Sequence, residues 1–187
     1  MLFNSSDAPS QIWQNVLHEL HRGALDPKHP FRFLTLATTG VQFPQVRTVV
    51  LRQLSPTMEF LVYTDARTAK VQDLLKTPRV SLLFYHPKKQ VQVRVKAIAT
   101  LHVEDALANE HWKRVSEKRQ SEYKSGLAPG TRIETPVLGW ETESESVHFS
   151  VLKLSPLSIE VLQLAREGHL RMQFELATGW RGTWLVP

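Results

Sequence analysis

The chain has 187 residues, of which 42% are hydrophobic and 22% are charged, and it contains no cysteine. This composition excludes a disordered chain and predicts a single domain, residues 1–187, with a full hydrophobic core. The lack of cysteine excludes a disulfide framework, a thiol nucleophile and a cysteine-ligated metal. No apolar run approaches the ~20 residues that cross a bilayer, and the N-terminal residues lack the basic flank of a signal peptide. We therefore expect a cytoplasmic protein.

The formal net charge of +5 favours anionic partners only weakly, because 23 cations are offset by 18 anions. The most one-sided stretch runs from His86 to Lys96 and contains Lys88, Lys89 and Arg94 but no acid. A solvated strand face is the simpler interpretation of this stretch. The alternative is a basic groove for single-stranded nucleic acid.

A first helix is predicted to start at Ser10, as its N-cap, and to end near Gly23 and the Asp26-Pro27 pair. Its apolar residues fall on one stripe, at Ile12, Trp13, Val16, Leu17 and Leu20. His18 and His21 lie three residues apart on this helix, which is a possible spacing for two metal ligands. Because no third ligand or carboxylate accompanies them in the prediction, we expect no metal site.

The middle of the chain alternates short apolar runs with turn residues. We predict strands over 31–38, 42–52, 58–64, 79–85 and 90–98. A short helix after Arg67 has its apolar side at Val71, Leu74 and Leu75, and Thr77-Pro78 ends it.

The second half is predicted to begin with a helix from Glu104 to about Tyr123, with Leu107, His111, Trp112 and Val115 on one side. Residues 125–146 have no periodicity and are predicted as a long loop. Two strands, hinged at Ser155-Pro156, and a final strand pair follow. Six to eight strands with few helices predict a mostly β fold, a closed or nearly closed β-barrel with flanking helices.

Cationic and hydroxyl side chains cluster where a strand ends and the short helix begins. Arg67 and Lys70 lie three residues apart there, and the Thr68 hydroxyl and the first backbone amides point the same way. One interpretation is an ordinary helix start with a solvated lysine, and the other is a phosphate site. Arg47 and Arg52 would point to opposite faces of an unbroken strand, so they cannot both serve one site.

The sequence contains no Gly-x-Ser-x-Gly, no His-Glu-x-x-His, no P-loop and no Gly-x-Gly-x-x-Gly. Nothing therefore points to a hydrolase or a kinase. If the protein is an enzyme, we expect the reactive atoms to belong to a bound molecule.

Five segments in order resemble the pyridoxamine 5′-phosphate oxidase family of FMN-binding split β-barrels. They read RTVVLR, FLVYT, ARTAK, TPRVSLLFY and KQVQVRVKA. The C-terminal HLR, GW and WLVP resemble the end of the same family, and most closely its shorter oxidase-related branch. The resemblance implies an FMN-binding split barrel and a homodimer with the flavin at the interface.

The resemblance also implies site residues. The strand along the flavin would be Arg47, Thr48, Val49, Val50 and the segment up to Arg52, which stands where the oxidases have lysine. Lys70 matches the family's phosphate lysine, Tyr63 and Thr64 the neighbouring strand, and Gln90 the glutamine that addresses the isoalloxazine ring. Arg171 of the His169-x-Arg171 pair would reach the flavin of the partner subunit. The arginine that precedes the family's lysine is Ala69 here, so we expect Arg67, with Thr68 beside it, to supply that charge.

The departures concern the site for the vitamin phosphate. The oxidases hold it with a Tyr, an Arg and a Ser on the helix after the glutamine strand, where this chain has His111, Val115 and Arg119. The Arg two residues before the His-x-Arg pair is Glu167, the Trp near the flavin falls at Val161 or Leu162, and the loop lacks an evident Gln-Ser pair.

Four functions stay open on the sequence. The leading one is an FMN-dependent oxidoreductase of this family, with Gln90 and Arg171 tuning the flavin and an unknown small-molecule substrate. The others are a genuine pyridoxamine/pyridoxine 5′-phosphate oxidase, a flavin-binding protein without turnover, and the nucleic-acid binder described above.

Overall fold

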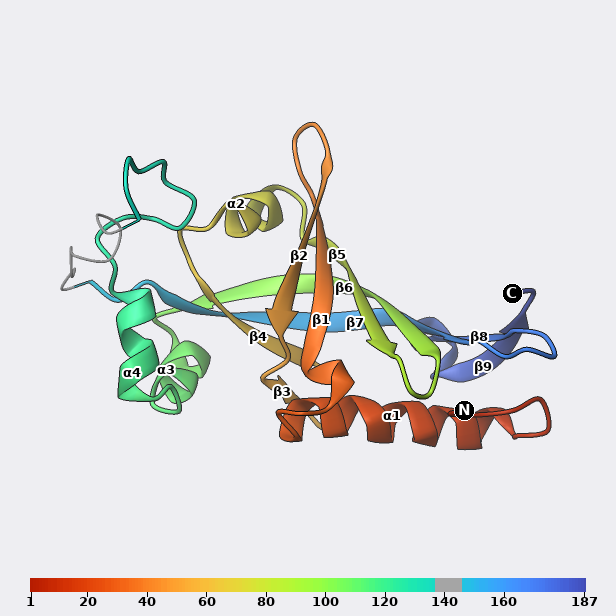
Figure 1. Cartoon of the computed structure of the whole chain (residues 1–187). Helices are drawn as coiled ribbons and strands as arrows, with labels where there is room; N and C mark the ends of the chain where they lie inside the picture. Colours follow the sequence, from red (N-terminus) through yellow and green to blue (C-terminus); the bar gives the residue numbers. More distant parts are fainter. Residues whose placement is uncertain (137–145) are drawn as a thin grey trace.

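A computed structural model describes residues 1–136 and 146–187 (Figure 1). Residues 137–145 of the predicted loop lie outside the described residues. The helices are α1 (Pro9–Leu25), α2 (Ala69–Lys76), α3 (Ala106–Trp112) and α4 (Glu117–Gln120), with 3-10 turns η1 (Pro30–Arg32), η2 (Ser121–Tyr123) and η3 (Leu176–Thr178). The strands are β1 (Phe33–Thr39), β2 (Pro44–Val50), β3 (Gln53–Leu54), β4 (Phe60–Asp65), β5 (Arg79–His86), β6 (Val91–Val103), β7 (Phe149–Gln163), β8 (Leu170–Glu175) and β9 (Arg181–Leu185).

These nine strands form one sheet, and every pairing in it is antiparallel. The order is β2-β1-β5-β6-β7-β4-β3, with β8 paired to β7 and β9 to β8. One half of β7 pairs with β4 and its other half with β8, so the sheet branches at β7. The mostly β fold with flanking helices that the sequence predicts is confirmed.

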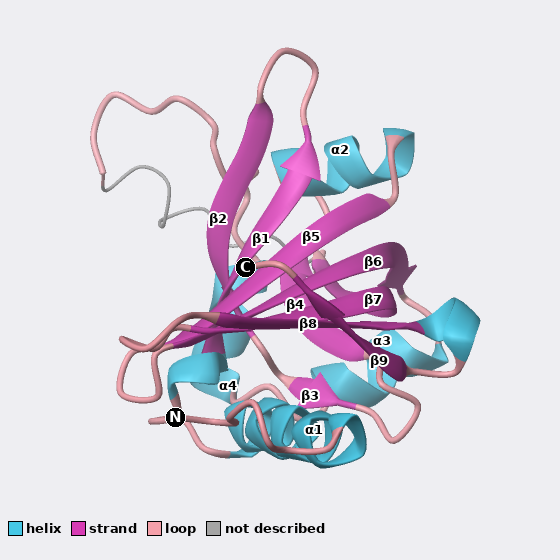
Figure 2. Cartoon of the chain, turned by 90° about the vertical axis from the view of Figure 1, so that its right-hand side faces the viewer, coloured by secondary structure: helices cyan, strands magenta, loops and turns pink. Residues whose placement is uncertain are grey.

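The core lies on one face of this curved sheet. In β6, residues Val91, Val93 and Val95 are fully buried, whereas Arg94 and Lys96, which alternate with them, are exposed, as the predicted alternation requires. Helix α1 adds Ile12, Val16 and Leu20 to the same core. It lies at the lower end of the sheet and α2 at the upper end (Figures 1 and 2).

Helix α1 starts differently from the prediction, and it ends where the Asp26-Pro27 pair predicts, with Asp26 as its C-cap. Its N-cap is Ala8 rather than Ser10, because Pro9 opens the helix, and proline suits the first helical position. Gly23 does not end the helix but lies inside it, against Phe31, and the helix continues to Leu25.

Three other predictions about elements are wrong. The helix predicted over 104–123 is broken into α3 and α4. Leu75, predicted on the apolar side of α2, is 66% exposed, because that short helix packs through Val71 and Leu74 alone. The two strands predicted on either side of Ser155-Pro156 are the single strand β7.

Proline is tolerated in β7 because it lies at an irregular point. The register with β6 shifts there, so that Lys96 faces Ser158 while Ala97 faces Pro156. On the other edge of β7, the partner strand changes at the same point. Pairing with β4 ends at Leu154 of β7, and pairing with β8 begins at Ser158. Proline in sheets is confined to such bulges and edges.

No helix in the described part of the chain is long and apolar enough to span a membrane.

Candidate functional site

The residues predicted to hold the cofactor lie on five parts of the fold. Residues 47–50 lie on β2, Arg52 follows that strand, and Tyr63 and Thr64 lie on β4. Arg67, Thr68 and Lys70 lie at the start of α2, Gln90 lies in the turn between β5 and β6, and Arg171 lies on β8. Because β2 ends at Val50, Arg47 and Arg52 do not share an unbroken strand. The prediction that their side chains point to opposite faces of one strand therefore does not apply.

Lys70 lies at the centre of a small polar cluster between β4 and α2. Its ammonium donates to the hydroxyl of Thr64, at 2.8 Å, and to that of Thr68, at 3.2 Å. Thr68 is the N-cap residue of α2, so the first-turn amides of that helix lie beside the same cluster and have no helical carbonyl to bond. The cluster therefore joins a cation, two hydroxyls and a helix N-terminus.

Arg47 adds a second cation to this cluster. Its guanidinium donates to the Thr38 hydroxyl, at 2.7 Å, and lies 3.9 Å from the Asp73 carboxylate of α2. Burial lowers the pKa of the Lys70 ammonium, and the nearby Arg47 guanidinium lowers it further. The Asp65 carboxylate opposes the shift of the Lys70 pKa, and Asp73 offsets part of the Arg47 charge, but a bound anion would still stabilise the charged Lys70 ammonium. We call Arg47, Thr64, Thr68 and Lys70 the phosphate cradle.

Arg67 is engaged elsewhere. Its guanidinium donates to the Asp65 carboxylate, at 2.7 and 3.1 Å, and to the carbonyl oxygen of Ser125, at 3.0 Å. Its charge is thus neutralised by Asp65, and its side chain fixes the loop after η2. The pairing of Arg67 with Lys70 on one anion, which their spacing suggests, is not present in this conformation.

The outer face of the sheet carries a broad hollow of about 660 Å³. Val46 of β2, Leu83 of β5, Arg94 of β6 and Arg171 of β8 are among the residues that line it. Glu160 of β7 accepts hydrogen bonds from both Arg94 and Arg171, so these cations are paired across three strands. The Arg171 Nε is buried and lacks a hydrogen-bond partner among the described residues.

The predicted residues form two groups that are far apart in one chain. Thr64 pairs with Ser150 and Arg171 pairs with Leu162, and these two partners are 12 residues apart on the single strand β7. At about 3.3 Å per residue this is roughly 40 Å along the strand. Gln90 lies at the Arg171 end, because its carbonyl accepts from the Leu164 amide just beyond β7. One chain therefore brings the phosphate cradle together, with Gln90 toward the other end of β7, whereas Arg171 lines the same hollow as Val46, the neighbour of Arg47.

A second group of cations gathers next to β4, around a pocket of about 240 Å³. Arg52, Arg114 and Arg119 line it together with Tyr63 and Tyr123. The Nε of Arg52 is buried without a hydrogen-bond partner among the described residues, and its guanidinium lies 5.0 Å from the centre of the Tyr63 ring. We call these five residues the arginine pocket.

Part of this pocket was not predicted from the sequence. Arg119 was expected near the vitamin-phosphate position, but Arg114 and Tyr123 were not expected there, because one unbroken helix was predicted over 104–123. The break between α3 and α4 turns Arg114 and Arg119 toward the same cavity. The signal that could have found Arg114 was the basic run KRVSEKR itself.

Tyr63 links the arginine pocket to the buried His111. Its hydroxyl lies 2.8 Å from His111 Nδ1, within hydrogen-bond distance. Burial lowers the pKa of the His111 ring, and the Arg114 guanidinium lowers it further, so the imidazole is neutral at pH 7. Burial also raises the pKa of the Tyr63 phenol, although Arg52 opposes that shift. The pair is thus a neutral phenol on a neutral imidazole.

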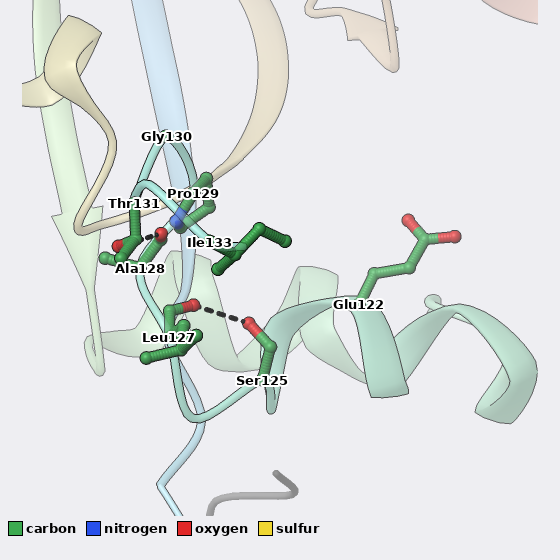
Figure 3. A pocket seen from close by; sticks show the side chains of 8 residues that line it. All are labelled: Glu122, Ser125, Leu127, Ala128, Pro129, Gly130, Thr131 and Ile133. Carbon is green, nitrogen blue, oxygen red and sulfur yellow. Dashed lines mark hydrogen bonds between the residues drawn. The ribbon is translucent and has the colours of Figure 1, made fainter. Parts of the chain in front are cut away.

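The loop after η2 forms a third cavity, of about 290 Å³ (Figure 3). Leu127, Ala128, Pro129 and Ile133 contribute most of its wall, and Ser125 bonds to the Leu127 carbonyl within it. Glu122 is the one charged residue in this wall, and its carboxylate points away from the loop in Figure 3. This composition offers no reactive or ligand-binding constellation.

The sequence of the chain matches a known protein family and several of its curated members. A family model described as pyridoxamine 5′-phosphate oxidase, FMN-binding domain, matches residues 10–103, which include α1, the phosphate cradle and Gln90. The pyridoxine/pyridoxamine 5′-phosphate oxidase of Bartonella henselae is 30% identical over 96 residues, 51% of this chain and 45% of that protein. The enzyme of the same name from Azorhizobium caulinodans is 30% identical over 95 residues, 50% of this chain and 43% of that protein. The chain thus aligns with less than half the length of these curated relatives.

Solved structures extend the likeness to nearly the whole chain. A pyridoxamine 5′-phosphate oxidase-related, FMN-binding protein of Nostoc punctiforme matches with a TM-score of 0.77 and 24% identity, over 97% of this chain and all of that one. PhzG of Burkholderia lata, solved with tetrahydrophenazine-1-carboxylic acid, matches with a TM-score of 0.75 and 16% identity, over 98% and 95%. At these identities the structures establish the fold alone. Together with the family model, they place this chain in the pyridoxamine 5′-phosphate oxidase-related family of FMN-binding domains.

Proposed function

We propose that the protein is an FMN-dependent oxidoreductase that works as a homodimer. The observation that carries the proposal is the phosphate cradle, because it gathers two cations, two hydroxyls and a helix N-terminus at one point. Family membership supports FMN as the anion that the cradle holds. Bound FMN would supply the electron transfer, for which the chain's own side chains have no equivalent.

The residues of the cradle fit a phosphate monoester. Lys70 and Arg47 would neutralise its charge, and the hydroxyls of Thr64 and Thr68 would donate to its oxygens in place of the Asp65 carbonyl, their present acceptor. Thr48, Val49 and Val50 would line the ring with the backbone of β2. Arg67 would act indirectly, since it holds Asp65 and the Ser125 loop beside the cradle.

The homodimer is part of the proposal and is implied by the family resemblance. Along β7 the strand partners of Thr64 and Arg171 are roughly 40 Å apart, and we propose that Gln90 and Arg171 of a second copy reach the flavin. There, the Gln90 amide and the Arg171 guanidinium would donate to the polar edge of the ring. Donors at that edge stabilise the reduced, more negative flavin and so raise its electron affinity.

The arginine pocket supports an anionic substrate. Arg52 and Arg119 would bind a carboxylate or phosphate there, and the buried Arg52 Nε lacks a hydrogen-bond partner among the described residues. Arg114 is already paired with Glu110, and Glu122 also lines the cavity. This observation favours keeping the second candidate, a genuine pyridoxamine/pyridoxine 5′-phosphate oxidase. An assay for hydrogen peroxide with pyridoxamine 5′-phosphate tests that candidate directly.

Two other candidates have less support. A flavin-binding protein without turnover would hold FMN and show no reduction by nicotinamide cofactors or small amines. A nucleic-acid groove would use Lys88, Lys89, Arg94 and Lys96, but Lys89 is paired with Glu19 and Arg94 with Glu160. Half of the proposed groove is therefore neutralised within the chain.

The phosphate assignment is tested by replacing Lys70. Lys70→Ala removes a charge-assisted hydrogen bond, so we expect the dissociation constant for FMN to rise about 10- to 100-fold. The measurement is flavin retained through gel filtration, followed by a fluorescence titration. Lys76→Ala, in the exposed last turn of the same helix, is the matched control and should bind like wild type. If Lys70→Ala retains its flavin as well as wild type does, the assignment is wrong.

A further inference from the structure

A buried cluster of charged and titratable side chains lies outside the site described above. Glu19 of α1 has a side chain that is only 2% exposed, and its carboxylate lies 3.2 Å from His29 Nε2, 3.8 Å from His86 Nε2 and 2.8 Å from Lys89 Nζ. His29 follows α1, whereas His86 and Lys89 belong to the end of β5 and the turn after it. The cluster therefore ties the first helix to the β5–β6 turn.

The geometry does not suit a metal ion, although one carboxylate and two histidines would be a familiar ligand set. His29 Nδ1 accepts from the Phe31 amide, at 3.1 Å, and His86 Nδ1 accepts from the Lys89 amide, at 3.2 Å. Each neutral ring therefore carries its proton on Nε2, the nitrogen that faces Glu19, and has no lone pair there for a metal. The Lys89 ammonium already binds the same carboxylate. The cluster is a set of donors around one acceptor.

An ion pair and several hydrogen bonds fix the position of the β5–β6 turn. Lys89 is fixed through its ammonium by Glu19 and through its amide by His86. Its carbonyl and that of Gln90 both accept from the side-chain amide of Gln163, which is fully buried. The Gln90 carbonyl also accepts from the Leu164 amide.

The turn so held has a strained residue at its end. Gln90 has a φ of +51°, in the left-handed region that residues other than glycine and asparagine rarely adopt. Its side chain is exposed, and its amide has no hydrogen-bond partner among the residues that the structure describes. Such strain persists only where the surroundings enforce it, and it is concentrated at functional sites.

We propose that Glu19 is a positioning residue: through Lys89 and His86 it fixes the β5–β6 turn so that Gln90 presents its free amide to the flavin. The proposal rests on the function proposed above, in which Gln90 contacts FMN. It adds a role for the first helix, α1, which carries Glu19. Glu19 itself touches no ligand, because it is buried behind Lys89.

A double-mutant cycle on FMN affinity tests this role. Gln90→Ala should raise the dissociation constant roughly 5-fold, the value of one ordinary hydrogen bond, and Glu19→Gln should raise it by a similar factor. If Glu19 acts through Gln90, then Glu19→Gln should have less than a 2-fold effect in the Gln90→Ala background. Glu59→Gln, which breaks the pair between Glu59, just before β4, and Lys153 of β7, is the matched control and should leave the affinity unchanged in both backgrounds.

Each outcome bears on a different claim. An equal loss from Glu19→Gln in both backgrounds would mean a general structural role and overturn the proposal, as would a Gln90→Ala variant that binds like wild type. Zinc bound by wild type but not by His86→Ala would also overturn it. If wild type binds no FMN, the proposed function fails instead. Should Glu19→Gln not fold, Lys89→Met breaks the same contact from the turn side, and the same cycle with Gln90→Ala decides.

Discussion

Gln90 combines a strained backbone with an exposed side chain whose amide makes no hydrogen bond to a described residue. The left-handed conformation costs an L-residue about 1–2 kcal/mol, and glycine adopts it without that cost. Glutamine rather than glycine at this position indicates that the amide is needed for something other than stability.

Gln90→Gly should therefore separate stability from binding. We expect this variant to be more stable than wild type by about 0.5–1 kcal/mol, because relief of strain exceeds the entropy cost of glycine. It should bind FMN more weakly, because the amide is lost. The measurements are urea unfolding of the flavin-free protein and a flavin titration. Because asparagine tolerates the left-handed region, the stability of Gln90→Asn should lie between those of wild type and Gln90→Gly. A less stable Gln90→Gly protein would contradict the account of strain.

The Glu19 carboxylate should make stability depend on pH in one direction. Burial alone would raise the pKa of Glu19, but the hydrogen bonds from Lys89 and His29 and the charge of Lys89 outweigh burial and hold that pKa below its ordinary value of 4.5. A group whose pKa is lower in the folded than in the unfolded state stabilises the fold above the unfolded pKa. That contribution is lost as the pH falls through the folded pKa.

We expect Glu19→Gln to lower the free energy of unfolding by about 1–3 kcal/mol at pH 7, because it removes the charge from buried hydrogen bonds. The difference from wild type should shrink once the pH falls below 4.5, the ordinary glutamate value. Urea unfolding of both proteins at pH 7 and at pH 4 measures it. A difference that stays constant between these pH values would mean that the carboxylate charge contributes nothing.

Among the elements, α1 shows how a helix position can reverse the usual effect of a substitution. Gly23 lies in the last turns of α1, where alanine normally stabilises a helix by about 1 kcal/mol. A β-carbon there would lie 2.7 Å from the Phe31 β-carbon and 2.9 Å from the backbone carbon of that residue. Backbone cannot move aside as a flexible side chain can, so close approach outweighs helix propensity.

Gly23→Ala should consequently destabilise the protein by about 1–3 kcal/mol. The matched control is Gln14→Ala at an exposed position of the same helix, which should change the free energy of unfolding by no more than about 0.5 kcal/mol. Denaturant unfolding compares the two. If Gly23→Ala stabilises the protein, the contact between α1 and η1 is looser than described.

The sequence predicted elements well where local periodicity decides them and poorly where tertiary contacts do. The alternation of Val91, Val93 and Val95 with polar residues correctly predicted β6, because burial on one face imposes a period of two. Pro156 misled the prediction for β7, because only the pairing with β4, β6 and β8 reveals that it lies at a bulge. The break between α3 and α4 was missed for a similar reason, since the helical period continues through Val115.

At the scale of the whole molecule, the candidate site could be predicted only in part. The spacing of Thr68 and Lys70 after a strand marked the phosphate cradle, because those residues are close in sequence. Arg47 reaches the cradle, and Arg52 reaches Arg114, only through the three-dimensional fold. No local pattern could tell that Gln90 and Arg171 lie far from the cradle of their own chain.

The proposed dimeric site predicts that flavin binding depends on assembly. We expect wild type to elute at twice the chain mass of 21.4 kDa and to bind two flavins per dimer. Dilution below the dimer dissociation constant should release the flavin, because Gln90 and Arg171 of the second copy would be lost with it. Light scattering and flavin fluorescence on one dilution series measure both. A monomer that binds FMN with undiminished affinity would contradict the dimeric site.

The most direct test of FMN binding is the visible absorbance spectrum of the purified protein, followed by identification of what heat releases from it. We predict a yellow protein that releases FMN, one molecule per chain. A colourless protein that also fails to bind added FMN would contradict the central claim, and the phosphate cradle would then need another anion.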